Sequence, residues 1–339
     1  MKKYVAKRIG YMVIVFLVLS FFMYFLYNLI PNDPVRAELE GQRDQLLPDQ
    51  YEELYNRRRE ELGLNDPLIV RYGRWLGVVP EKSTGKFSGI LEGDFGESSY
   101  FRTNVINVIP SRMKVTIFMN IFVTILALGI TIPLGIFCAV HKKGKLDNVT
   151  QVITIIGYSI PIYIVGLLFI WFFAVTLKWF PVMGAKTPGS SYTGMQAILD
   201  QLYYMALPII VMTFASLGGM TRYVRSAMID SLGMDCIRTA RAKGVKEKVV
   251  IYSHAFRNAL LPVITIVIGW FLSIFSGSLI VENTFTLNGM GALYITGLNN
   301  HDYELVLAIQ MFYTMVSLVG ALITDLSYGL VDPRIRVDK

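Results

Sequence analysis

Long apolar runs with almost no charge alternate with polar segments along the whole chain. Six such runs cover residues 9–30, 115–140, 149–177, 201–220, 260–281 and 305–330. The first has 22 residues, and at about 1.5 Å per residue it makes a helix of roughly 33 Å, enough to cross a hydrocarbon core of about 30 Å. Because backbone groups in lipid need internal hydrogen bonds, each run predicts a helix. The pattern therefore predicts an all-α integral membrane protein with six transmembrane helices.

Composition supports a membrane protein and excludes other classes. Hydrophobic residues make up 53% of the chain and charged residues only 17%, against about 25% in soluble domains. So much apolar surface is incompatible with a disordered chain. The three histidines and two cysteines share no metal-ligand spacing, so we expect no metal site. No nucleophile–base set is visible, which argues against a membrane-embedded enzyme.

The distribution of basic residues predicts the orientation. Lys178 and Lys186 are the two basic residues in the short loops on one side, whereas the tails and short loops on the other side hold 18. Such residues concentrate on the cytoplasmic side, so both termini are expected there. The 18 are Lys2, Lys3, Lys7, Arg8, Lys142, Lys143, Lys145, Arg222, Arg225, Arg238, Arg241, Lys243, Lys246, Lys248, Arg257, Arg334, Arg336 and Lys339.

These observations predict four regions. Residues 1–30 form a cytoplasmic start and the first helix, and residues 31–113 form a large extracellular cap. Residues 114–330 form a five-helix core with a cytoplasmic loop at 221–259, and a cytoplasmic tail follows. The cap is too long for a simple connector. Its helical patterns at 49–64 and 65–76 fit either a docking surface for an external partner or a solvated lid.

The basic loop at 221–259 is the most informative segment. Residues 234–243 have a helical pattern. Ile237, Ala240, Arg241 and Gly244 fall at i, i+3, i+4 and i+7, which is one face of a helix. A short helix with small residues on that face is suited to a groove of a cytoplasmic protein. A basic amphipathic stretch lying on anionic headgroups is the alternative.

A second group of residues is a candidate lining for a pathway. Pro161 should kink the third run, beside Tyr158 and Ser159, and Ser273 and Ser276 add hydroxyls to the fifth run. An apolar pore would oppose a peptide backbone, and polar uncharged groups would favour its passage. The alternative is that the kink serves packing and that the hydroxyls bond carbonyls of their own helices.

Three acids near the ends of runs have open roles. Asp325 lies inside the last run, where a structural pair near Arg334 and Arg336 and a functional carboxylate are both possible. Glu282 and Asp302 flank the fifth loop, where they would either face an external partner or be solvated.

The segment 222–245, which reads RYVRSAMIDSLGMDCIRTARAKGV, resembles the signature loop of permeases from binding-protein-dependent ABC importers, in the oligopeptide and dipeptide version. On the general E-A-A-x3-G pattern, Arg238-Thr239-Ala240 stand at E-A-A and Gly244 at the glycine. Arg238 departs from the Glu of that pattern. Further resemblances are Pro31-Asn-Asp-Pro, Glu61-Leu-Gly-Leu-Asn-Asp-Pro, Gly93-Asp-Phe-Gly, Gly157-Tyr-Ser-Ile-Pro and Asp325-Leu-Ser-Tyr-Gly-Leu-Val-Asp-Pro-Arg-Ile-Arg.

This resemblance implies a type I ABC importer permease, most similar to the B-type subunit. It implies a heterodimer with a related C-type permease, two cytoplasmic ATPases and an external peptide-binding protein. The residues that it implies for coupling to an ATPase are Asp235, Ile237, Arg238, Ala240, Arg241 and Gly244. The chain has no G-x-x-x-x-G-K-[S/T] loop, so ATP and Mg²⁺ belong to partner subunits, and this subunit needs no cofactor and is no enzyme.

Two other functions stay open. The same transporter class can carry nickel or glutathione, because selectivity largely resides in the external binding protein. A stand-alone secondary transporter would need charged residues or broken helices near the midplane. It would leave the loop motif unexplained, and nothing in the composition calls for nucleic acid.

Overall fold

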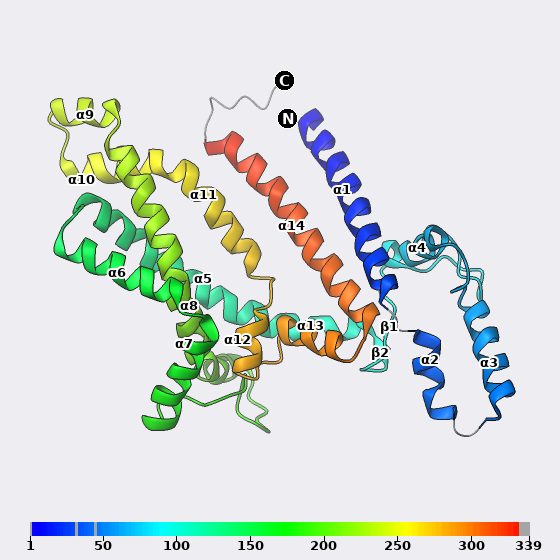
Figure 1. Cartoon of the computed structure of the whole chain (residues 1–339). Helices are drawn as coiled ribbons and strands as arrows, with labels where there is room; N and C mark the ends of the chain where they lie inside the picture. Colours follow the sequence, from blue (N-terminus) through cyan, green and yellow to red (C-terminus); the bar gives the residue numbers. More distant parts are fainter. Residues whose placement is uncertain (1, 31–32, 44–45, 332–339) are drawn as a thin grey trace. The chain divides into compact units, whose positions relative to one another are not determined.

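A computed structural model of the chain describes residues 2–30, 33–43 and 46–331 (Figure 1). Within these ranges the chain is mostly helical and has very little strand. The α-helices are α1 Lys2–Leu29, α2 Pro34–Leu39, α3 Pro48–Glu61, α4 Leu68–Leu76, α5 Val105–Val140, α6 Lys145–Ser159, α7 Ile162–Phe169, α8 Gly194–Leu232, α9 Asp235–Ala242, α10 Glu247–Val249, α11 Phe256–Ser273, α12 Leu279–Thr284, α13 Met290–Asn299 and α14 Tyr303–Val331. π-helical turns occupy Ile170–Thr176 and Val250–Ala255, and 3-10 turns occupy Glu40–Gln42 and Ile90–Glu92.

The strands in the described ranges form one short hairpin. β1 (Glu97–Ser98) pairs antiparallel with β2 (Thr103–Asn104), with Glu97 opposite Asn104. The Pro31–Asn32 part of the first motif and the 332–336 part of the last motif lie outside the described residues, as does the predicted tail after Val331.

The chain forms two compact units. Unit 1 comprises the described residues within 1–5, 111–293 and 316–339, and unit 2 comprises those within 6–110 and 294–315. Unit 1 therefore holds most of the apolar helices that follow the first one. Unit 2 holds α1, the polar segment after it and the start of α14.

Helix length and apolarity agree with the predicted multi-span architecture. α1 from Val5, α5, α8 and the Tyr303–Ser327 part of α14 are each long and apolar enough to cross a membrane. Two further pairs of helices raise the number of spans to as many as six if each bent pair is one span. The third predicted run is one of these pairs, since α6 meets the helix Ile162–Thr176 at 100°.

Pro161 explains this bend. It sits at the N-terminal cap of α7, and Ile160 before it has an extended backbone with φ −84° and ψ 127°. Proline disfavours the helical region for the residue that precedes it, and it has no N–H to continue a helix. The predicted kink is therefore present, but as a sharp break between two helices.

The fifth predicted run also differs from the structure. It was expected to continue to residue 281, but α11 ends at Ser273 and α12 begins at Leu279. Asn120 of α5 holds the end of α11, because its side-chain amide donates to the carbonyl oxygens of Ser273 at 3.1 Å and Ser276 at 2.9 Å. A buried amide from a neighbouring helix thus satisfies carbonyls that a helix end leaves free.

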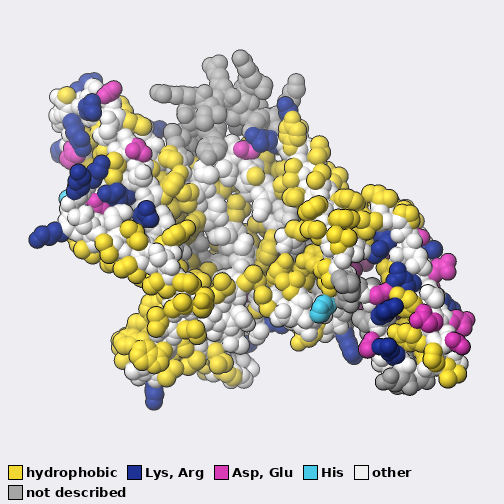
Figure 2. Space-filling model, viewed as in Figure 1, with side chains coloured by type: hydrophobic (Ala, Val, Ile, Leu, Met, Phe, Trp, Pro, Cys, Tyr) yellow, Lys and Arg dark blue, Asp and Glu magenta, His cyan; other side chains and the backbone are white. Residues whose placement is uncertain are grey.

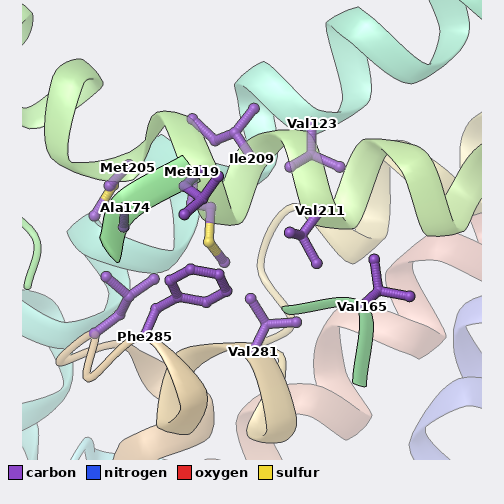
Figure 3. Packing of buried hydrophobic residues seen from close by; sticks show 11 residues of the cluster. Met119, Val123, Val165, Ala174, Met205, Ile209, Val211, Val281 and Phe285 are labelled. Atoms are coloured by element: carbon purple, nitrogen blue, oxygen red, sulfur yellow. The ribbon is translucent and has the colours of Figure 1, made fainter. Parts of the chain in front are cut away.

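Two apolar clusters hold unit 1 together. The first joins α5, α7, α8 and α12, and Figure 3 shows Phe285 facing Met119 and Val281. Phe285 is only 2% exposed. The second cluster joins α5, α8, α9 and α11, with Val224, Ile237 and Val263 among its fully buried members. The first cluster positions the α12 segment, and the second positions α9.

Within unit 2, α4 packs on α1 through aromatic rings. Tyr72 lies edge-on to Phe21 with ring centroids 5.2 Å apart, and its hydroxyl is 2.7 Å from the Ser20 hydroxyl. α3 is highly charged and has no buried residue. Figure 2 shows both signs of charge mixed over this helix. Helices near the predicted 49–64 and 65–76 are thus present as α3 and α4.

Candidate functional site

The end of α8 turns back through α9 and α10 into α11, and this segment contains the predicted coupling loop. Ser231 ties the two arms together, because its buried hydroxyl donates to the Ala255 carbonyl at 2.6 Å. Ile237 of α9 is fully buried between the arms, and Ala240 is 8% exposed. Burying an isoleucine contributes about 1.5–3 kcal/mol, so α9 is held firmly on the body of unit 1.

Gly244 ends α9 in a Schellman motif. Its φ is +74°, its N–H donates to the Arg241 carbonyl at 3.0 Å, and the next N–H, of Val245, donates to the Ala240 carbonyl at 3.2 Å. Glycine adopts this backbone region with less strain than residues that have a Cβ. A Cβ at Gly244 would meet no atom within 4 Å, so the chain itself leaves space there. The predicted reason for a small residue here was close approach of a partner, whereas the structure adds a backbone reason.

The predicted coupling residues divide between two faces of α9. Ile237 and Ala240 face the chain's own core, whereas Asp235, Arg238 and Arg241 are exposed. Arg241 pairs with Glu247 at 2.6 Å and Arg238 with Asp235 at 3.4 Å. Such exposed pairs contribute little to stability. The face available to a partner is therefore the charged one, which ends at Gly244, and Figure 2 shows basic side chains gathered over α9 and α10.

A buried ion pair that sequence analysis missed lies at the same end of α8. Arg225 donates to both carboxylate oxygens of Asp147, from Nε at 2.6 Å and from a terminal nitrogen at 2.7 Å. The Asp147 side chain is 1% exposed. The Lys143 N–H also donates to this carboxylate, at 2.8 Å. Asp147 stands in the first turn of α6, where an acid is common, but no local signal pointed to a partner 78 residues away.

Ser273 and Ser276, two of the predicted pathway residues, lie together in a polar recess of unit 1. The recess has a volume of about 230 Å³ and lies among α5, α8, α11 and the turn that follows α11. Its lining is mostly hydroxyl, amide and apolar groups and contains no charged side chain. The lining residues are Asn120, Val123, Thr124, Met212, Ser216, Trp270, Ser273, Ser276, Gly277 and Ser278.

The polar stripe of α5 was also missed, although the sequence contained a signal for it. Thr116, Asn120 and Thr124 recur every four residues in an otherwise apolar run, and all three are buried. That spacing places them on one face of a helix. Polar residues on one face of a span point to a protein-facing or water-facing side rather than to lipid.

Tyr158, Ser159 and Pro161 are not part of the recess lining. Tyr158 is 74% exposed, and the Ser159 hydroxyl donates to the Ile155 carbonyl of its own helix at 2.8 Å. Ser273 likewise donates to Trp270 of its own helix, at 2.7 Å. The structure thus brings together the two serines of α11 and its following turn and leaves the α6–α7 group elsewhere.

Both expectations for Glu282 and Asp302 required an exposed side chain, but the two side chains are buried. Glu282 is fully buried and accepts from the Thr116 hydroxyl at 2.8 Å and the Ala292 N–H at 2.9 Å. Burial raises the pKa of this carboxyl. In unit 2, Asp302 is 1% exposed and accepts from Ser98 and from the Tyr100 N–H. Both expectations are wrong because these acids organise backbone that has no other partner.

The apolar helices, the anchored α9 and the polar recess define a multi-pass membrane subunit. Comparison with known proteins gives its family. Residues 131–337 match the family described as binding-protein-dependent transport system inner membrane component, and residues 1–120 match the N-terminal part of that class of membrane component. The chain belongs to this family of transport-system permeases.

Individual relatives align with nearly the whole of this chain. The oligopeptide transport system permease protein AppB of Bacillus subtilis is 35% identical over 99% of this chain and 100% of its own. The glutathione transport system permease protein GsiC of Salmonella paratyphi A is 30% identical over 99% of each chain. The inward-facing MetNI methionine ABC transporter has a similar fold, with a TM-score of 0.52 and 18% identity over 67% of this chain and 97% of that chain. The predicted type I importer architecture is confirmed.

Proposed function

We propose that this chain is the B-type membrane subunit of an ATP-driven peptide importer, in which it forms one half of the pathway beside a related C-type permease. Similarity to an oligopeptide permease over 99% of the chain carries this proposal. The uncharged, hydrogen-bonding recess supports it, because such a lining suits amide groups better than ions. Two ATPase subunits that bind ATP and Mg²⁺ and an external binding protein complete the transporter.

Glutathione is the second candidate cargo, and the similarity to GsiC favours it over nickel. Uptake by a strain that lacks this gene decides among the three. We expect the strain to lose uptake of labelled tri- and tetrapeptides and to regain it when the gene is restored. Normal peptide uptake with lost glutathione or nickel uptake would overturn the peptide assignment and name the other cargo.

The exposed face of α9 is the proposed contact with an ATPase. Gly244→Trp adds bulk where the chain leaves open space, so we expect the variant to lose peptide-stimulated ATP hydrolysis by about tenfold or more. Gly244→Ala is the matched control, because it carries a Cβ at the same positive φ but adds almost no bulk. Assembly and ATP hydrolysis are measured in reconstituted membranes. If the Trp variant couples as well as the Ala variant, α9 is not the contact.

Arg241 tests the charge of the same face. Arg241→Glu reverses one charge and also breaks the pair with Glu247. The double variant Arg241→Glu/Glu247→Arg restores an intrachain pair but not the original surface. We expect both variants to couple poorly. Recovery in the double variant would mean that the pair, rather than the surface charge, matters.

Both termini and α9 are proposed to lie on the cytoplasmic side. Accessibility of single cysteines tests this, after Cys138 and Cys236 are replaced by serine. Lys86→Cys and Lys246→Cys are both at exposed positions. An impermeant thiol reagent should label intact cells at 86 and not at 246. The reverse pattern contradicts the orientation.

A further inference from the structure

The polar recess has hydrogen-bonding groups that the chain itself does not use. Three of its hydroxyls are occupied. Ser216 donates to the Met212 carbonyl at 2.7 Å and Ser273 to the Trp270 carbonyl at 2.7 Å. Ser278 accepts from the Val281 N–H at 3.4 Å. The Asn120 amide nitrogen is occupied by the carbonyls at the end of α11. In contrast, Asn120 Oδ1, Thr124 Oγ1 and Ser276 Oγ have no hydrogen-bond partner within the described ranges.

These free groups show which environment the recess needs. A polar group that faces hydrocarbon without a partner costs free energy, and lipid tails offer no partner. The recess therefore faces a water-filled pathway rather than the bilayer. Its volume of about 230 Å³ exceeds the roughly 30 Å³ that one water occupies in the liquid, so it has room for several waters or for a short piece of chain.

The chemistry of the free groups matches an amide. Asn120 Oδ1 accepts a hydrogen bond, whereas the Thr124 and Ser276 hydroxyls both donate and accept. An amide has one N–H donor and one C=O acceptor, so both of its groups find a partner here. The lining carries no charge and therefore has nothing to select among charged side chains, and the Trp270 ring supplies an apolar wall.

We propose that this recess is a subsite that binds the backbone amides of a peptide during its passage. Thr124 and Ser276 replace the water that the peptide unit loses, and Asn120 both holds the end of α11 and presents its carbonyl oxygen to the substrate. The subsite rests on the proposed peptide function and adds a location and a recognition chemistry to it. It accounts for broad acceptance, because every peptide has the same backbone.

The subsite is tested by comparing two peptides in the parent transporter and in a variant of the recess. The reconstituted importer receives binding protein preloaded with a labelled tetrapeptide or with the same peptide N-methylated at one internal amide, so that capture is equal. The parent should transport the methylated peptide about five- to tenfold more slowly, since one hydrogen bond is lost. The variant Thr124→Val/Ser276→Ala should transport both peptides at the slower rate, with ATP hydrolysis still stimulated by loaded binding protein.

Ser216→Ala is the matched control, because this hydroxyl lines the recess but is already bonded to Met212. It should keep the parent's preference between the two peptides. If the double variant also keeps that preference, the recess holds water only and the subsite is wrong. If the parent transports neither peptide but transports another cargo, the proposed function itself fails, which is a different result.

If the double variant does not assemble, a second measurement on a different variant tests the same subsite. Ser276→Cys, in a chain with Cys138→Ser and Cys236→Ser, is treated with a small methanethiosulfonate reagent during turnover. Loaded binding protein should slow the modification several-fold relative to empty binding protein. Equal modification rates with loaded and empty binding protein would overturn the subsite.

Discussion

Unit 1 buries two carboxylates, and it stabilises them in different ways. Asp147 at the start of α6 is held by the Arg225 guanidinium, which bonds both of its oxygens. Glu282 of α12 is held by the Thr116 hydroxyl and the Ala292 N–H, both uncharged. Asp147 thus depends on an opposite charge, whereas Glu282 depends on neutral donors from α5 and from the first turn of α13.

This difference indicates the structural role of each carboxylate. The Asp147–Arg225 pair joins two helices beside the segment that contains α9, and its geometry requires a full negative charge. Glu282 instead fills a pocket of backbone. A Cβ on Gly289 would lie 2.6 Å from its carboxylate, so the turn before α13 closes directly around it. A neutral acceptor can therefore replace Glu282 with a small loss, whereas no neutral residue can replace either member of the ion pair.

The largest effect is expected for Arg225→Gln. It leaves Asp147 buried without its cation, and removal of one partner from a buried pair costs about 3–5 kcal/mol. The Arg225 side chain is 21% exposed, so we expect the lower end of that range, about 3 kcal/mol. The measurement is reversible unfolding of the full chain in mixed detergent micelles. A change below about 1 kcal/mol would show that water reaches Asp147.

The exchanged pair Asp147→Arg/Arg225→Asp sharpens this result. It should recover only part of the loss, because the Lys143 N–H donates to Asp147 at the N-terminal end of α6, where a cation is unfavourable. Full recovery would mean that the attraction between the two charges is the whole effect and that the first turn of α6 contributes nothing.

Glu282 should give a smaller effect that depends on the replacement. Glu282→Ala leaves the Thr116 O–H and the Ala292 N–H without an acceptor and opens a cavity, at a cost of about 2–3 kcal/mol. Glu282→Gln keeps an acceptor for Ala292 and should cost about 1 kcal/mol. The same unfolding measurement compares the two variants. Equal losses would show that the negative charge of Glu282 is essential, as it is for Asp147.

Sequence could predict the helices of this chain better than their breaks. Lipid requires long apolar runs, so all six runs were visible, and the N–H missing from Pro161 signalled the break before α7. The end of α11 at Ser273 was not visible. It depends on the Asn120 amide of a different helix, and a contact over more than 150 residues leaves no local pattern.

The candidate site likewise has features that local sequence predicts and features that depend on distant contacts. Gly244 and the α9 helix followed from local spacing. Which face of α9 is free depends on the buried cluster that Ile237 shares with Val250 and Ala255. Charge on Glu282 and Asp302 suggested exposure, because ionised groups favour water. Their burial depends on backbone donors that no sequence pattern displays. Sequence therefore predicts local geometry well, but it does not predict which polar groups find a partner across the fold.

The smallest expected effect concerns Thr116, which links Glu282 to the turn before α13. Its hydroxyl donates to Glu282 and accepts from the Met290 N–H, each at 2.8 Å. Thr116→Val keeps the shape but removes both bonds, which should cost about 1–2 kcal/mol. Thr116→Ser keeps the hydroxyl and should cost less than about 1 kcal/mol.

Thr116→Val combined with Glu282→Gln tests whether the two residues act as one unit. Because they share a hydrogen bond, the double variant should lose less than the sum of the single losses, by at least about 0.5 kcal/mol. The pairing of Thr116→Val with Arg225→Gln is the control, since these residues belong to different networks and their losses should add. Strict additivity in both pairs would show that the Met290 bond alone matters at Thr116. Glu282 would then be held by backbone only, and its contrast with Asp147 would be sharper still.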